Sequence, residues 1–105
     1  MKNTSKFKII ITPEAVSDVE NASDWYELHV KGLGKRFYKE IKLHLKSLKT
    51  LPFGFQIRYS DVRCVTVKNF PFLIHYRVIE ETKTISIIAV FHTSQNPNIW
   101  KHRTE

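Results

Sequence analysis

The residues of this sequence that could do chemistry are basic, aromatic and imidazole side chains in its second half. They stand in segments that are otherwise rich in β-branched and aromatic residues, which is typical of strands. Imidazole can exchange a proton near neutral pH, and guanidinium can stabilise charge on a phosphate. Such a set suits RNA cleavage, in which a 2′-hydroxyl loses a proton and a leaving oxygen gains one. Its members are Arg58, Tyr59, Arg63, Lys68, His75, Tyr76, Arg77 and His92.

His92 is the candidate for proton transfer within this set. It closes an apolar run at residues 87–91 and precedes the polar segment 93–97. A strand end of this kind can present a side chain to solvent, where imidazole can act as a general acid or base. A hydrogen-bonded structural histidine fits the same position, and both interpretations stay open.

Arg63 and Arg77 each interrupt a largely apolar strand. An unpaired buried charge is costly, so each guanidinium needs a partner. The partner can be a phosphate, or the arginine can cap the sheet edge or pair with a helix acid such as Asp18 or Asp24. Strand alternation places Tyr76 on the face opposite to Arg77, which favours a core role for the tyrosine.

The net charge of +7, from 17 Lys and Arg against 10 acids, favours an anionic partner: a nucleic acid, a ribosome or an acidic protein. The candidate RNA contacts follow from this charge, although a row of lysines on an amphipathic helix is also typical of a solvated face. They are Lys39, Lys42, Lys46, Lys49, Arg58 and Lys68.

Several other classes of chemistry are not indicated. The sequence has no Gly-rich phosphate loop, no histidine pair at metal-ligand spacing on a helix and no Gly-x-Ser-x-Gly elbow, so we expect neither a metal nor a cofactor. The single cysteine, Cys64, lies inside a predicted strand and is interpreted as a buried thiol. The polar opening and the short apolar run at 9–11 predict a cytoplasmic protein with no membrane partner.

The elements that must position these residues begin with a strand at residues 7–11. Thr12 and Pro13 then supply a helix N-cap and a first helical residue, and the first helix is expected to end near Gly32. A second helix is predicted after Gly34, with an apolar face every three or four residues. The short connection folds the two helices into an antiparallel hairpin.

Four strands are predicted to follow, at residues 55–59, 62–68, 72–80 and 84–92. The last is apolar at every position from 87 to 91, which predicts an interior strand, and the first strand of the chain is expected to pair beside it. The predicted fold is α+β: an N-terminal strand, an antiparallel helical hairpin and a four-stranded antiparallel meander in one twisted sheet. Residues 1–105 are expected to form a single domain, and the tail from residue 96 is too short for another.

The order of these motifs resembles the RelE/ParE superfamily of type II toxin-antitoxin toxins, which includes plasmid-stabilisation proteins. The resemblance runs from Phe7 to about Trp100 and rests on the combination of motifs rather than on any one of them. It implies a RelE/ParE-like fold and a cognate antitoxin, encoded nearby, with an extended segment that wraps the toxin. The similar segments are residues 15–19, 25–26, 37–41, 51–54, 62–65, 70–78 and 88–92.

The resemblance implies two possible activities. RelE-like members are ribosome-dependent, metal-independent endonucleases that cut messenger RNA, and on that model Arg63, Arg77 and His92 carry the chemistry. The C-terminal tyrosine of many such nucleases is absent, and Trp100, which cannot exchange a proton, lies nearest to its place. ParE-like members inhibit DNA gyrase by protein binding. The endonuclease is our first hypothesis and the gyrase inhibitor the alternative, while a degenerate toxin that only joins its antitoxin on the operator is a third.

Overall fold

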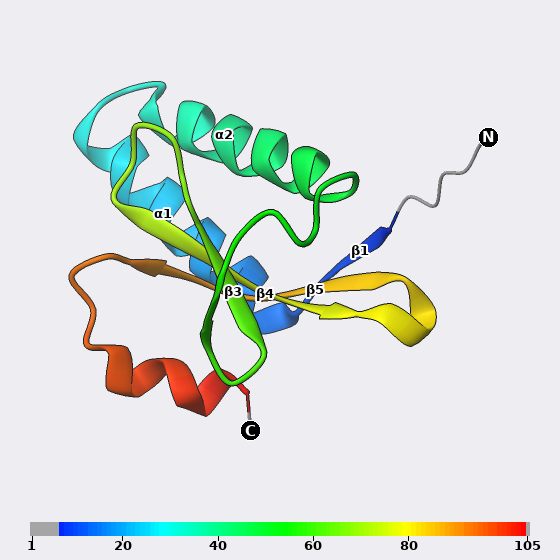
Figure 1. The fold of residues 1–105 in the computed structure, drawn as a ribbon. Helices are drawn as coiled ribbons and strands as arrows, with labels where there is room; N and C mark the ends of the chain where they lie inside the picture. Colours follow the sequence, from blue (N-terminus) through cyan, green and yellow to red (C-terminus); the bar gives the residue numbers. More distant parts are fainter. Residues whose placement is uncertain (1–6, 105) are drawn as a thin grey trace.

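The computed structural model describes residues 7–104, which run as a strand, a helical hairpin, four strands and a short C-terminal helix (Figure 1). The predicted α+β class and the order of elements are confirmed. The long elements are β1 (Lys8–Ile11), α1 (Pro13–His29), α2 (Leu33–Leu48), β2 (Ile57–Tyr59), β3 (Val62–Thr66), β4 (Phe72–Ile79) and β5 (Thr84–His92). Two 3₁₀ helices complete the chain, η1 (Glu80–Thr82) and η2 (Pro97–Arg103).

The five strands form one mixed sheet in the order β1-β5-β4-β3-β2. The pairs β2–β3, β3–β4 and β4–β5 are antiparallel, as the predicted meander requires, and β1 lies parallel to β5. The first strand therefore pairs beside the last one, and β5 is an interior strand, as predicted. Two covered faces explain why most side chains of β5 are buried.

The hairpin is built by the residues that the sequence singles out. The Thr12 hydroxyl accepts the backbone N–H of Ala15 (3.2 Å) and caps α1. Gly32 adopts a left-handed conformation (φ 87°) as the N-cap of α2, so this helix begins at Leu33 rather than after Gly34. The Glu27 carboxylate accepts the N–H groups of Gly32 (2.8 Å) and Gly34 (3.0 Å), which fixes the connection.

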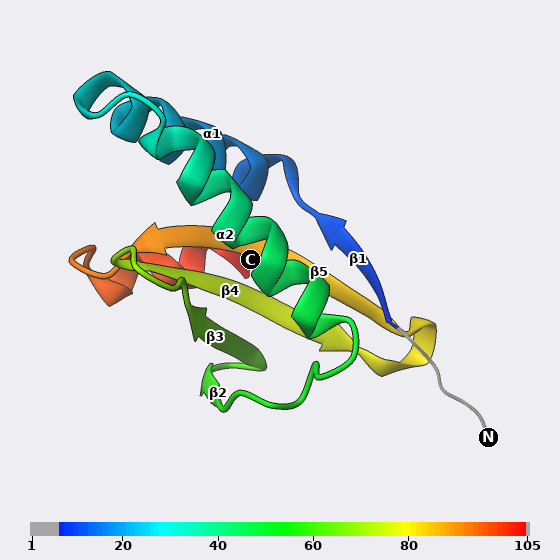
Figure 2. The same cartoon turned by 90° about the horizontal axis from the view of Figure 1, so that it is seen from above.

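The two faces of the sheet are covered differently, with α2 above and η2 below the strands in Figure 1, and the view from above shows α2 crossing β4 (Figure 2). The helix-covered face holds the larger core, where Phe37 and Tyr76 are fully buried. The Tyr76 hydroxyl donates to the Pro52 carbonyl (2.8 Å), which confirms the core role predicted for this tyrosine. The opposite face holds a smaller cluster closed by Trp100 of η2.

The structure corrects some predicted element bounds. The third strand ends at Thr66 rather than at residue 68, because the Lys68 N–H donates to His44 Nε2 (3.0 Å) and Asn69 turns the chain with a positive φ of 69°. The tail from residue 96, predicted only to lack a domain of its own, folds as η2. No helix within residues 7–104 is long and apolar enough to cross a membrane.

Candidate functional site

Arg63 lies on the helix-covered face of β3, opposite Tyr76 in the β3–β4 register. Its guanidinium donates to the Phe55 carbonyl and stands over the Phe53 ring, 5.1 Å from the centroid. Both partners belong to the connection between α2 and β2. The charge is therefore engaged in holding this connection against the sheet.

Arg77 lies on the other face of the sheet, next to the turn between β2 and β3. Its Nε and Nη2 donate to Asp61 Oδ2 at 3.1 and 3.0 Å. The two side chains are 40% and 56% exposed, so this ion pair contributes at most about 1 kcal/mol to stability. The helix acids proposed as partners were wrong for this arginine, because Asp18 and Asp24 belong to α1, which packs on the opposite face.

His92 ends β5 opposite Phe72, the first residue of β4. Its Nδ1 accepts the backbone N–H of Ser94 (3.0 Å), and the Ser94 hydroxyl lies 2.8 Å from the same atom. The imidazole thereby organises the turn after β5. Arg77 comes five positions after Phe72 on β4, which corresponds to about 17 Å at the rise of a strand. The three residues assigned to RNA cleavage do not share one cavity.

The candidate RNA contacts fall into two places. Lys39, Lys42, Lys46 and Lys49 are exposed on α2 and point away from the sheet, since the buried residues of that helix are on its other side. Lys68 follows β3 beside α2, where its backbone bonds to the helix. Arg58 is on β2, with its guanidinium 5.9 Å from the centroid of the Trp100 ring on the side of η2. The helix lysines thus share one surface, from which Arg58 is remote.

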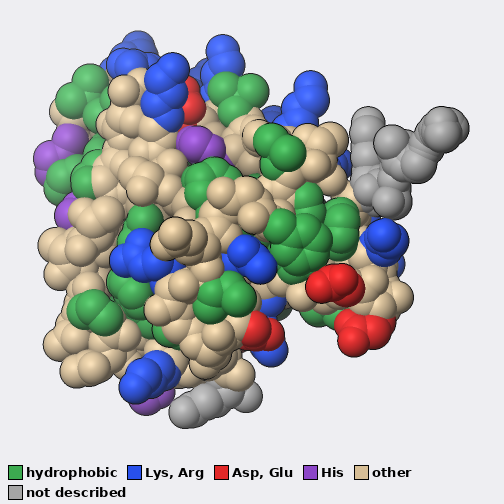
Figure 3. Space-filling view, viewed as in Figure 1, with side chains coloured by type: hydrophobic (Ala, Val, Ile, Leu, Met, Phe, Trp, Pro, Cys, Tyr) green, Lys and Arg blue, Asp and Glu red, His purple; other side chains and the backbone are tan. Residues whose placement is uncertain are grey.

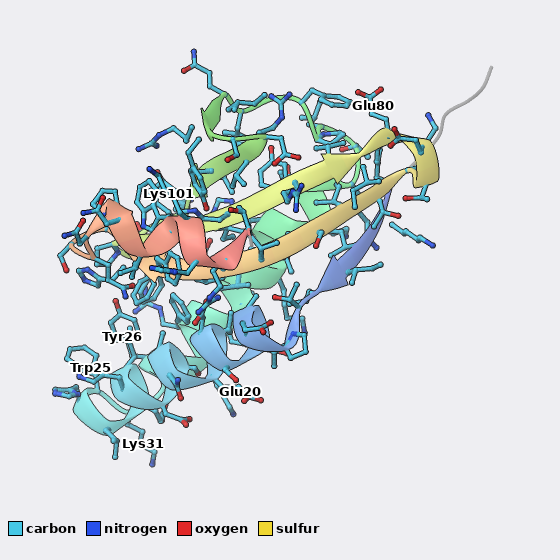
Figure 4. The ribbon with its side chains drawn as sticks, turned by 90° about the horizontal axis from the view of Figure 1, so that it is seen from below. Glu20, Trp25, Tyr26, Lys31, Glu80 and Lys101 are labelled. Atoms are coloured by element: carbon cyan, nitrogen blue, oxygen red, sulfur yellow. The ribbon has the colours of Figure 1, made fainter. Side chains whose placement is uncertain are left out.

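A groove that the sequence did not predict lies between α1, the end of β5 and η2. It has a volume of about 800 Å³, and apolar side chains form most of its lining. Figure 4 shows Trp25 and Tyr26 on α1 and Lys101 on η2, the two helices that form its walls. The lining residues include Asp18, Ala22, Trp25, Tyr26, Pro71, Phe72, Val90, Phe91, His92, Ile99, His102 and Arg103. We call this feature the α1–β5 groove.

An ion pair at this groove joins α1, β5 and η2. Asp18 accepts from Arg103 through two contacts, Nη1 to Oδ2 at 2.9 Å and Nη2 to Oδ1 at 3.0 Å. Asp18 Oδ2 also accepts the backbone N–H of Val90 (2.9 Å). The hydrogen bond to Asp18 raises the pKa of Arg103. Arg103 Nη1 also donates to the backbone carbonyl of Ile88 (2.9 Å). The pair anchors the C-terminal helix to the sheet.

A buried polar cluster lies under η2 on the same side of the sheet. His75 is fully buried, and its Nδ1 lies 3.0 Å from the Tyr59 hydroxyl and 3.4 Å from Cys64 Sγ. Burial lowers the pKa of His75 to about 4, with nearby Arg58 and Arg103 adding to the effect. Burial also raises the pKa of Cys64 to about 11, so the thiol stays protonated, as its interpretation as a structural residue requires.

The fold is that of known toxins. The chain is similar to a structure titled "Chromosomal ParDE TA system from P. aeruginosa", with a TM-score of 0.75 at 20% identity over 87% of this chain and 100% of that one. It is also similar to the isolated E. coli RelE toxin, with a TM-score of 0.55 at 12% identity over 93% of this chain and 96% of that one. These likenesses show the RelE/ParE fold, and the family match of residues 9–97 confirms the resemblance drawn from the sequence.

The family follows from the sequence itself. Residues 9–97 match the model of the family described as "ParE toxin of type II toxin-antitoxin system, parDE", and the chain belongs to this family. No curated protein matches the chain significantly. The family makes the chain a toxin of a type II system, which has a cognate antitoxin as partner.

Proposed function

We propose that this toxin inhibits DNA gyrase by binding, without catalysing a reaction, and that its antitoxin holds it inactive. The observation that carries the proposal is the separation of the three residues assigned to RNA cleavage, each already engaged with a neighbour of its own. Membership of the ParE family adds support, since ParE-like toxins are the gyrase-inhibiting branch of the superfamily. The proposal thus favours the alternative over the endonuclease.

Metal-independent RNA cleavage needs a base, an acid and cationic groups around a single phosphate. Arg63 and Arg77 are on opposite faces of the sheet. His92 ends β5 and pairs with Phe72, which is at the other end of β4 from Arg77. His75 is buried and its lowered pKa of about 4 keeps it neutral at physiological pH. A toxin that acts by surface contact needs none of these groups to converge.

The test pairs two purified systems. We expect the chain to inhibit supercoiling of relaxed plasmid by gyrase, and to leave messenger RNA intact in a reconstituted translation reaction. His92→Ala should inhibit supercoiling within about threefold of the wild type, because His92 organises a turn and transfers no proton in this function. Messenger RNA cut by the wild type and spared by His92→Ala would restore the endonuclease hypothesis.

The α1–β5 groove is the surface we assign to the antitoxin. Its apolar lining includes the half-exposed Trp25 and the partly buried Tyr26 and Phe72. Large aromatic side chains in a concave apolar surface are typical centres of binding energy. The occupant that fits is an antitoxin segment with apolar anchors and acidic flanks, because the basic residues Lys101 and His102 of η2 stand beside the opening.

Trp25→Ala should weaken antitoxin binding at least about tenfold, since the change removes a large aromatic contact from the groove. Titration calorimetry of the purified toxin with its antitoxin measures the change. Leu28→Ala is the matched control, because Leu28 is on the same helix, is 85% exposed and is not among the lining residues. Equal affinities of the two variants for the antitoxin would contradict the assignment of this groove as the antitoxin-binding surface.

A further inference from the structure

Five lysines form one straight row along α2 and its C-cap residue. Lys35, Lys39, Lys42, Lys46 and Lys49 follow each other at alternating spacings of four and three residues, and all five are exposed. With about 100° of rotation per residue, they fall within an arc of about 80° on the helix surface. At about 1.5 Å per residue the row is about 21 Å long. We call this surface the lysine stripe.

The stripe is opposite to the buried side of the helix. Phe37, Ile41 and Leu48 are at most 4% exposed and pack into the larger core. Their positions on the helix centre about 140° from the centre of the lysine stripe. Because the core fixes the rotation of α2, the five ammonium groups are held in a row that points to solvent. Figure 3 shows Lys and Arg side chains along the upper edge of the molecule, where Figure 1 places α2.

Acidic side chains do not neutralise this charge. In the part of the chain that the structure describes, the salt bridges are Arg77–Asp61 and Arg103–Asp18, and neither involves α2. Glu40 is the only acid of the helix, and it projects about 140° from the centre of the stripe. On a solvated helix face, lysines more often have acidic residues three or four positions away, and the lysines of this row have none.

The geometry suits a rigid polyanion better than a flexible one. Single-stranded nucleic acid is usually held by several exposed aromatic rings on which bases stack. On α2 the exposed aromatic ring beside the stripe is that of Tyr38, and the Lys42 ammonium lies 5.3 Å from its centroid. Duplex DNA instead presents phosphates in two fixed rows with one charge per about 1.7 Å of axis, which a straight row of cations can match without stacking.

We propose that the lysine stripe binds the phosphate backbone of duplex DNA. The inference extends the proposed function, because the substrate of gyrase is duplex DNA and a toxin that contacts both would be held at the enzyme–DNA complex. The contact reads no sequence, since lysines that meet phosphates position a protein without specifying bases. Neutralising five phosphates gives a salt dependence of log Kobs against log salt with a slope of about −4.5.

The test is a salt series of fluorescence anisotropy with a labelled 30-base-pair duplex. The stripe variant Lys39→Gln, Lys42→Gln, Lys46→Gln should lose about 2.7 from the magnitude of the slope. The control variant Lys8→Gln, Lys31→Gln, Lys101→Gln has the same change in net charge, at three exposed lysines outside α2, and should lose less than about 1. Glutamine keeps the helix propensity of lysine, so circular dichroism should be unchanged.

Equal slopes for the two triple variants would overturn the proposal, because binding would then follow net charge alone. Tighter binding of single-stranded RNA of the same length, lost in the stripe variant, would also overturn it and point to RNA. The two proposals can fail separately. If the wild type inhibits gyrase but the stripe variant binds the duplex as tightly as the wild type, only the DNA-binding role of the stripe is refuted. If the stripe binds DNA but the wild type does not inhibit gyrase, only the proposed function is refuted.

Discussion

Asp18→Ala is expected to lower the free energy of unfolding by about 3 kcal/mol. Asp18 accepts two hydrogen bonds from Arg103 and one from the backbone N–H of Val90. The side chains of Asp18 and Arg103 are only 15% and 24% exposed, so water cannot replace these bonds well. Removing one partner of a mostly buried pair leaves the other charge and a backbone donor without compensation. The shift of the urea midpoint at constant m-value measures the loss.

Asp24→Ala is the control for this prediction. Asp24 is on the same helix but is exposed, so its replacement should change stability by no more than about 0.5 kcal/mol. Combining Asp18→Ala with Arg103→Ala gives a stricter test, because the double variant should be less destabilised than the sum of the two single variants by about 2 kcal/mol. Additive effects would mean that the ion pair does not hold η2 to the sheet.

The helices and strands could be predicted because local patterns decide them. Thr12 and Pro13 start α1 by a cap that needs only neighbouring residues. The apolar run in β5 correctly predicted an interior strand, but the sequence did not reveal the β-bulge that is part of the reason for this run. Tyr76 pairs with Ile87 and His75 with Ala89, so Ile88 is an extra residue in the ladder. Ile88 and Ala89 consequently contact the same small core, and the strand needs apolar residues on successive positions.

The candidate site was harder to predict because its contacts join distant segments. Asp18 and Arg103 are 85 residues apart, and no periodic pattern relates them. The partners of the arginines also depend on turns and strand pairing. Asp61 lies in the turn before β3 and reaches Arg77 only once β3 and β4 are in register. The sequence did identify the lysines of α2, since a three- and four-residue spacing on a helix specifies one surface. What those lysines bind depends on chemistry outside the chain.

His75 makes stability fall in acid. The pKa of a histidine in the unfolded chain is about 6.5, and burial lowers that of His75 in the folded protein to about 4. Between pH 6.5 and pH 4 the His75 imidazole is protonated in the unfolded chain but stays neutral in the folded chain. The contribution of His75 to stability is therefore complete above pH 6.5. It is lost as the pH falls to about 4 and levels off below that value. The total loss is about 3 kcal/mol.

The variant His75→Gln isolates this contribution, since glutamine can keep a hydrogen bond to Tyr59 and does not titrate. The free energy of unfolding of both proteins is measured by urea at intervals between pH 7 and pH 4. The difference between the two curves should narrow by about 3 kcal/mol over this range, because only the wild type loses stability through His75. If the two curves of unfolding free energy against pH were parallel, the imidazole would not be buried in its neutral form. Water or a charged group would then have to contact it under η2.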